Sequence, residues 1–259
     1  GEWAKQDPDA ALDWSKSLDG REASRATTGA LAEIAKSDPA KAASMVGDLD
    51  ESARARAYAS IAGEWAKQDW GSTESWIAGL PGDQQDEAMG SAIRSLAAED
   101  TALAAQKTLA IAEGAARVNA IEEVSEQMAK DDASGAMDWV MTNGNTEAQK
   151  ESVGDVMQSW VAQDRVAALG WINNQSEGEV RDAAVQSYVF NDRTGSPQEN
   201  IALAESIGDE RSRERAVGMT AFRWMSEDSE GATQYIQNSD SVSDRMKERL
   251  LDGGGRQGQ

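Results

Sequence analysis

The chain has 259 residues, of which 46 are acidic and 25 are basic, and its formal net charge is −21 at pH 7. It contains nine tryptophans but no cysteine and no histidine, which excludes a disulfide framework, a thiolate zinc site, a cysteine nucleophile and a histidine general base or haem ligand. The negative charge would repel a phosphate backbone, and no apolar run approaches the roughly 20 residues of a membrane span, so we expect neither a nucleic-acid partner nor membrane insertion.

A repeat organises the whole chain. The segment Gly1–Asp7 recurs letter for letter at residues 63–69, and the register can be followed at half that distance through one polar residue per unit, which we call the marker residue. The marker residues are Asp7, Asp38, Asp69, Asp100, Asp132, Asp164, Ser196 and Asp228. Successive markers are 31 or 32 positions apart, so eight units fill the chain. A fixed period of this length is typical of helical solenoids and related repeat folds.

The sequence pattern of each unit predicts a short helix, a turn and a longer helix, in that order. Asp7 precedes Pro8, and two other markers also precede proline, which is the pattern of an N-cap followed by proline at the first helical position. A short helix of about ten residues is therefore expected after each marker. The longer helix fills the rest of the unit, as Ala26, Ala30 and Ile34 illustrate by their spacing of four on one helical face. No segment alternates with period two over a strand's length, so the fold class is predicted to be all-α.

Large apolar residues recur four positions before the marker and seven positions after it. These pairs are separated by eleven residues across the capped break between units: Trp3 with Trp14, Trp65 with Trp76, Met128 with Trp139, and Trp160 with Trp171. We expect the two members of each pair to contact each other, joining the longer helix of one unit to the short helix of the next. Their recurrence on a fixed register favours a place in the core over a place in a ligand site.

The seventh unit departs from the pattern. Tyr188 aligns with Trp160, and the four residues from Arg193 to Ser196 read as an insertion after Asp192. In repeat arrays, insertions map to loops on one face, which is often the binding face.

The chain resembles the tetratricopeptide-like class of helical-hairpin solenoids. The resemblance rests on the Asp-Pro-x-x-Ala junction at residues 7–11 and 38–42 and on paired helices throughout residues 1–252. The unit of 31–32 residues is shorter than that family's 34, and the Trp-x-x-Leu-Gly-x-x-Tyr signature is missing, so the resemblance is to the class. It implies a right-handed α-solenoid of about eight two-helix repeats, whose short helices line a concave binding surface.

We expect residues 1–252 to form a single repeat array that continues upstream, followed by a flexible glycine-rich tail at 253–259. By the same resemblance, the short helices should display partner-binding residues that depart from the repeat consensus: Asp13, Lys16, Glu74, Gln106, Lys107, Asp138, Glu205 and Gln234. Arg193 joins this set because it lies in the insertion. Trp70 replaces proline after its marker and lies outside the apolar columns; it either packs on the neighbouring turn or anchors a partner.

No catalytic constellation, cofactor motif or metal site is predicted. Acidic pairs such as Asp131 and Asp132 lack the glycine and glutamate spacing of a calcium loop and read as helix caps. The leading hypothesis is a non-enzymatic scaffold that binds a protein or peptide, of basic or polar character, on its concave face. One alternative is a structural or self-associating extracytoplasmic spacer, and another is an α/α-toroid enzyme acting on carbohydrate. The lack of cysteine fits a reducing cytosol and an oxidising periplasm equally well, so the compartment stays open.

Overall fold

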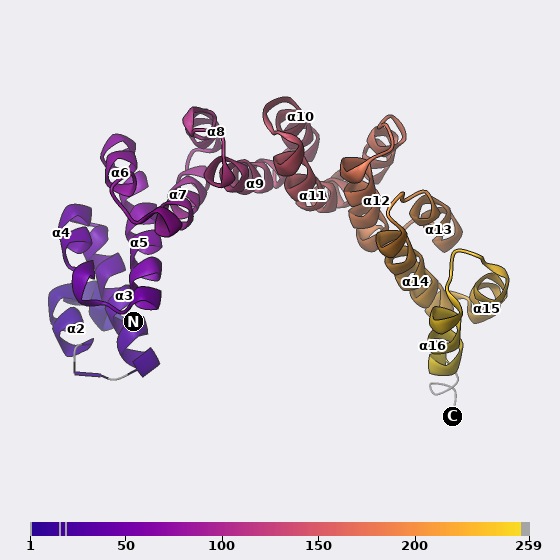
Figure 1. Ribbon diagram of the computed structural model, residues 1–259, viewed down its shortest axis with the longest axis horizontal. Helices are drawn as coiled ribbons and strands as arrows, with labels where there is room; N and C mark the ends of the chain where they lie inside the picture. Colours follow the sequence, from indigo (N-terminus) through magenta and orange to yellow (C-terminus); the bar gives the residue numbers. More distant parts are fainter. Residues whose placement is uncertain (1, 16, 19, 255–259) are drawn as a thin grey trace. The chain divides into compact units, whose positions relative to one another are not determined.

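The computed structural model describes residues 2–15, 17–18 and 20–254, and within those residues the fold is helical throughout, without a β-strand (Figure 1). This confirms the all-α prediction. We call the helix after a marker residue an A helix and the next one a B helix. The A helices are α2 (Pro8–Ser15), α4 (Pro39–Ser44), α6 (Trp70–Ile77), α8 (Thr101–Ala110), α10 (Ala133–Asn143), α13 (Pro197–Glu205) and α15 (Ser229–Asn238). The B helices are α3 (Gly20–Ala35), α5 (Glu51–Ala66), α7 (Gly82–Ala97), α9 (Ala115–Ala129), α12 (Glu179–Asn191), α14 (Glu210–Glu227) and α16 (Asp244–Gly254).

Three elements complete the set. Helix α1 (Glu2–Gln6) precedes the first marker, and a short 3₁₀ helix, η1 (Val46–Asp48), extends α4. Helix α11 (Thr146–Asn173) starts as a B helix and continues as an A helix beyond Asp164, whose backbone is not helical (φ −149°, ψ 88°). One extended residue therefore makes the whole junction between two helices at this point.

Helix contacts divide the chain into two compact units, Gly1–Gln127 and Met128–Gln259. In the first unit α3 packs on α5 and α5 packs on α7, while α4 contacts α3 and α5, and α6 contacts α5 and α7 (Figure 1). In the second unit α11, α12, α14 and α16 pack in sequence, while α13 contacts α12 and α14, and α15 contacts α14 and α16. Within each unit these B helices thus form a row, and α4, α6, α13 and α15 each contact two members of that row.

All eight marker residues cap the helix that follows them. Asp38, Asp69, Asp100, Asp132, Ser196 and Asp228 each accept a hydrogen bond from the backbone N–H three residues later. The carboxylate of Asp7 accepts from Ala10, and that of Asp164 accepts from the N–H groups of residues 166 and 167. These bonds satisfy N–H groups that have no partner inside the helix, so the predicted caps are confirmed.

Small buried residues allow the A helices to approach the row. The position four residues after the marker is buried in every unit: Ala11, Ala42, Thr73, Ala104, Ala136, Ala168, Asn200 and Ala232. A larger side chain would push the A helix away from the B helices on which it packs. The alanine column of the sequence is therefore a packing requirement.

Side chains also satisfy the free carbonyl groups at the ends of B helices. The Gln68 side-chain amide donates to the carbonyl oxygen of Ala35 (3.0 Å), and Gln163 does the same to Ala129 (2.6 Å). Each bond reaches back by about one repeat, from the turn after α5 or from within α11 to the end of the preceding B helix. The last carbonyl groups of a helix lack partners within it, so these bonds tie adjacent B helices together.

The predicted aromatic pairs meet. Ring centroids lie 5.7 Å apart for Trp3–Trp14, 5.4 Å for Trp65–Trp76 and 6.2 Å for Trp160–Trp171. Their burial differs, however. Trp160 is only 6% exposed, whereas Trp3 and Trp14 are 47% and 49% exposed, so a core role is wrong for that first pair.

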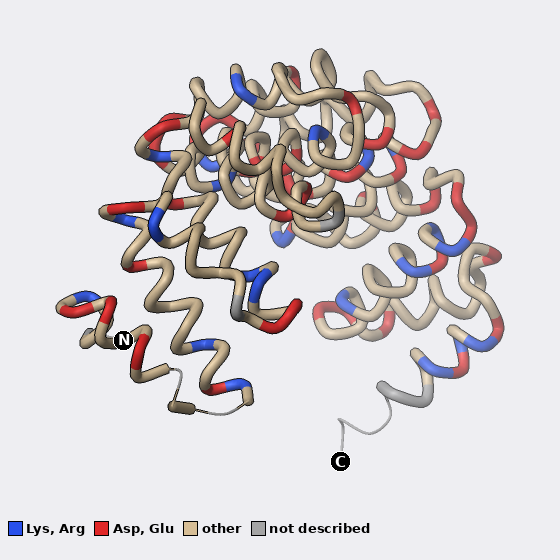
Figure 2. The backbone as a smooth tube through the Cα atoms, turned by 60° about the vertical axis from the view of Figure 1, so that its left-hand side comes forward, with Lys and Arg blue, Asp and Glu red and all other residues tan. Residues whose placement is uncertain are grey.

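The end of the chain also differs from expectation. Helix α16 runs to Gly254 and so includes the first two residues of the predicted flexible tail, while residues 255–259 lie outside the described residues. Acidic residues are distributed over both units (Figure 2). Among the described residues, no helix is both long enough and apolar enough to cross a membrane.

Candidate interaction surfaces

The predicted partner-binding residues lie on separate A helices. Asp13 on α2, Glu74 on α6, Gln106 on α8, Asp138 on α10 and Gln234 on α15 are exposed. Lys107 is half-buried on α8, and Arg193 is exposed in the connection between α12 and α13, while Lys16 lies outside the described residues. The structure therefore distributes these residues over several helices, and none of those that it describes lines either of the two grooves defined below.

Trp70 is partly buried at the first position of α6. It packs against a cluster of buried residues that includes Ala62, Ala66, Ile77 and Leu80. Of its two interpretations, the contacts favour packing on the neighbouring turn. The replacement of proline by tryptophan thus extends the core of the first unit.

Glu205 is held by a neighbouring A helix. Its carboxylate accepts a hydrogen bond from the Tyr235 hydroxyl (2.8 Å), which in turn accepts one from the Ser239 hydroxyl (3.1 Å). Burial, together with the adjacent carboxylate, raises the pKa of Tyr235 to about 12. The phenol therefore stays protonated and continues to donate at neutral pH, and Glu205 bridges α13 and α15.

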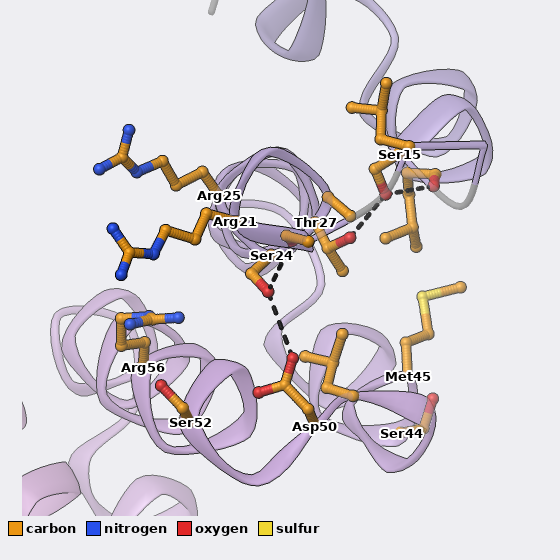
Figure 3. Close-up of a pocket in the computed structure, with 15 residues that line it drawn as sticks. Ser15, Arg21, Ser24, Arg25, Thr27, Ser44, Met45, Asp50, Ser52 and Arg56 are labelled. Atoms are coloured by element: carbon orange, nitrogen blue, oxygen red, sulfur yellow. Dashed lines mark hydrogen bonds between the residues drawn. The ribbon is translucent and has the colours of Figure 1, made fainter.

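The first unit has an open groove of about 1170 Å³, lined mainly by residues of α3 and α5 and by none of the predicted A-helix residues that the structure describes. We call it the α3–α5 groove (Figure 3). Arg21 and Arg25 project from α3, and Arg56 projects from α5, on the side opposite Ser15 and Met45. Arg21 and Arg25 are four residues apart and so share one face of α3. Their guanidinium groups and that of Arg56 make one cationic side of the groove.

These three arginines have no ion-pair partner among the described residues. Asp50, the one carboxylate among the described residues of the lining, attracts Arg56 without forming an ion pair with it; it accepts its hydrogen bonds from the N–H of Ala53 (2.9 Å), which caps α5, and from the Ser24 hydroxyl (3.3 Å). The Ala53 bond is the main reason that the pKa of Asp50 lies below its usual range. The guanidinium groups thus stay available to an external acceptor.

The opposite side of the groove combines apolar side chains such as Met45 with a buried pair of hydroxyl groups. The hydroxyl of Ser15 donates to the carbonyl of Leu12 (2.6 Å) and shares a second bond with Thr27 (2.7 Å), which joins α2 to α3. Ser15 and Thr27 are both buried. A groove whose wall is held by its own hydrogen bonds is pre-organised, which lowers the entropic cost of binding.

A second groove, of about 1020 Å³, lies on α14 and α16 in the second unit, and we call it the α14–α16 groove. Four arginines line it: Arg211 and Arg215 from α14, and Arg245 and Arg249 from α16. Both grooves are therefore built on adjacent B helices, and both are lined by arginine in a chain of net charge −21.

The sequence-based choice of A-helix residues missed these arginines. The sequence does carry a signal for them, because three arginine pairs are spaced by four on B helices: Arg21 with Arg25, Arg211 with Arg215, and Arg245 with Arg249. Such a spacing places both cations on one helical face, where they repel each other unless a partner neutralises them. Among the described residues none of these arginines forms an ion pair, although the chain has 46 carboxylates.

Within the described residues, no group of three or more carboxylates is arranged to hold a metal ion. Guanidinium groups in an open groove can form charge-assisted, bidentate hydrogen bonds with carboxylate or phosphate groups. No family model, curated protein or solved structure matches the chain.

Proposed function

We propose that the chain is a non-enzymatic scaffold that binds a protein or peptide. In this proposal it is a right-handed α-solenoid of about eight two-helix repeats, one array over residues 1–252. The caps on a fixed register, and the packing of each B helix on its neighbour within each unit, support this architecture. We place the binding surface on the B helices, because both grooves lie there.

The observation that carries the proposal is the α3–α5 groove with its three unpaired guanidinium groups. Surface arginines usually find an acidic neighbour in a protein this rich in carboxylates. Here the local carboxylate, Asp50, caps a helix instead. Charge complementarity across an interface contributes mainly to specificity and to the association rate, which suits a recognition surface.

This placement changes the expected partner. The overall charge favours a basic or polar partner, but the lining of both grooves favours acidic groups. A partner that approached the A helices would meet the exposed carboxylates Asp13, Glu74 and Asp138, whereas one that entered the B-helix grooves would meet arginine. We therefore propose that the chain binds through arginine and that its acidic surface excludes nonspecific anionic partners.

A random-peptide display library selected on the immobilised chain tests this function. Selected peptides are then titrated calorimetrically against the wild type, the double variant Arg25→Glu/Arg56→Glu, and the control Arg193→Glu, which reverses an exposed charge outside both grooves. We expect at least one peptide family to lose binding by about tenfold or more in the double variant and not in the control. Binding should also weaken in about 1 M salt, where the Debye length is about 3 Å.

Failure to enrich any peptide above an unrelated helical protein would count against a binding function. If sedimentation then showed oligomers that grow with protein concentration, the self-associating spacer would be the better hypothesis. Turnover of an oligosaccharide by the purified chain would favour the enzyme hypothesis.

A further inference from the structure

The α14–α16 groove differs from the α3–α5 groove because it combines cations with exposed apolar side chains. Arg211, Arg215, Met219 and Phe222 follow one another on α14 at spacings of four, four and three, so they share one helical face. Met219 is 53% exposed and Phe222 is 65% exposed. Large apolar side chains this exposed and next to each other mark an interaction site more often than isolated ones do.

The second wall comes from α16, which lies very close to α14. Gly218 is buried, and a β-carbon at this position would lie 2.9 Å from the terminal methyl group of Met246. The absence of a side chain at residue 218 therefore lets α16 settle against α14. Arg245 and Arg249 of α16 line the same groove as the arginines of α14.

The charge of the groove is not balanced from within. Of its two carboxylates, Glu214 accepts a hydrogen bond from the Ser243 hydroxyl, and Glu248 is exposed on α16. No ion pair joins either of them to the four arginines among the described residues. Arg249 instead contacts the sulfur of Met246 (3.0 Å), which is a weak acceptor. Four cations against two carboxylates leave a positive groove on a chain of net charge −21.

We propose that the α14–α16 groove binds an acidic amphipathic helix of a partner protein, with its apolar face on Met219 and Phe222 and its carboxylates on the four arginines. A groove between two helices accommodates a third helix, which is read through anchors at i, i+3, i+4 and i+7. A nucleic acid could use the arginines but would be opposed by the charge of the whole chain. The proposal rests on the scaffold function above and names the chemistry of one partner.

The test uses a labelled peptide probe in a fluorescence anisotropy titration. The probe has about 18 residues, roughly five helical turns, with leucine on one face and glutamate on the others. One comparison peptide replaces every glutamate with lysine, and another replaces every leucine with glutamine. We expect the acidic amphipathic peptide to bind at least about tenfold more tightly than either comparison peptide.

Matched variants of the chain locate the site. Arg211→Glu/Arg215→Glu should weaken binding of the acidic probe by about tenfold or more, and Lys36→Glu/Lys67→Glu, a double charge reversal at residues that line neither groove, should change it less than about twofold. Phe222→Ser should weaken the leucine-bearing probe and leave the weak binding of the glutamine peptide unchanged. Arg245→Glu/Arg249→Glu reverses the charge of the two arginines on α16. This variant replaces the α14 variant in the titration if circular dichroism shows that the α14 variant does not fold.

Three outcomes would overturn the proposal. Equal binding of the lysine peptide would remove the charge argument, and equal weakening by the Lys36→Glu/Lys67→Glu and α14 reversals would show a nonspecific field effect. Tighter binding of a labelled oligodeoxythymidine than of the peptide would assign the groove to nucleic acid. A concentration-dependent dimer lost in Arg211→Glu/Arg215→Glu would assign it to a second copy of the chain. If the acidic probe fails while library peptides still bind the α3–α5 groove, the scaffold function stands without this partner.

Discussion

Two junctions between successive repeats connect a B helix to the next A helix in different ways. At Asp69, in the first unit, the marker is exposed and caps α6, while Trp65 and Trp76 stack across the junction at 5.4 Å. Between α12 and α13, in the second unit, the chain is longer by the insertion, and Ser196 takes over the cap. Asp192, which directly precedes the inserted residues and is not the capping residue, is buried.

The extended junction is held by a buried carboxylate. Asp192 accepts hydrogen bonds from the Arg165 guanidinium (3.0 Å) and from the backbone N–H groups of Thr194 (3.1 Å) and Gly195 (2.8 Å). Burial alone would raise the pKa of Asp192, but these donors outweigh it, so the pKa lies below its ordinary value. One junction thus depends on apolar contact and the other on charge, and the two should respond differently to substitution and to pH.

The largest effect is expected at the aromatic junction. Trp65→Ala should lower the free energy of unfolding by about 3 kcal/mol, because a half-buried ring loses both its stacking partner and its apolar contacts. Urea unfolding followed by far-ultraviolet circular dichroism measures this without relying on tryptophan fluorescence. Trp3→Ala is the matched control, since its ring is 47% exposed and its loss should cost only about 1 kcal/mol. Equal losses would show that pairing, and not burial, sets the strength of a junction.

At the extended junction, Asp192→Ala should cost about 2 kcal/mol. The substitution leaves two loop N–H groups and the Arg165 guanidinium without their acceptor, but Arg165 keeps 30% of its side chain exposed and can be hydrated. The same urea titration measures the effect. A loss no greater than that of an exposed alanine substitution would show that water replaces the carboxylate without cost.

The Asp192 contribution should also depend on pH. Because its folded pKa lies below its unfolded value near 3.9, the folded state binds this proton less readily than the unfolded chain does. The stabilisation is therefore complete above about pH 4 and is lost as the pH falls through the folded pKa. The difference in unfolding free energy between wild type and Asp192→Ala should be constant from neutral pH down to about pH 5 and shrink below about pH 4. A difference that grows on acidification would contradict the assignment.

The smallest effect is expected at the cap. Ser196→Ala removes the hydroxyl that accepts from the N–H of Glu199 (3.1 Å) and should cost about 1 kcal/mol. Ser196→Asp, which restores the residue found at the other markers, should keep the stability within a few tenths of a kcal/mol of wild type. If Ser196→Ala left the free energy of unfolding unchanged, the Asp192 contacts alone would fix the start of α13.

The sequence predicts the features that arise from local spacing. Caps connect a marker to the N–H three residues on, and an aromatic pair spans eleven residues, so a repeating pattern of letters reveals both. The burial of Asp192 depends on Arg165, which lies 27 residues earlier in the chain, and the repeat predicts only a longer loop there. The exposure of Trp3 and Trp14 was missed for the same reason, because a position in a column does not say how many neighbours cover it.

The two grooves likewise depend on contacts that the repeat pattern does not predict. The repeat identified the B helices, but the cationic walls come from side chains on two different B helices, such as Arg25 and Arg56, brought together by packing. The resemblance to tetratricopeptide-like repeats directed the search for binding residues to the A helices. Only the spacing of arginines by four pointed to the other surface.

The contacts between neighbouring helices also bear on how the chain folds. In each unit the B helices of the row contact their neighbours in the row, and the hydrogen bonds that tie adjacent B helices together join residues about one repeat length apart, such as Gln68 and Ala35, 33 positions apart. Closing such short loops costs little chain entropy, and a low mean separation between contacting residues correlates with fast folding. A nascent chain can therefore bury each new hairpin on the previous one as it emerges, without waiting for a distant segment.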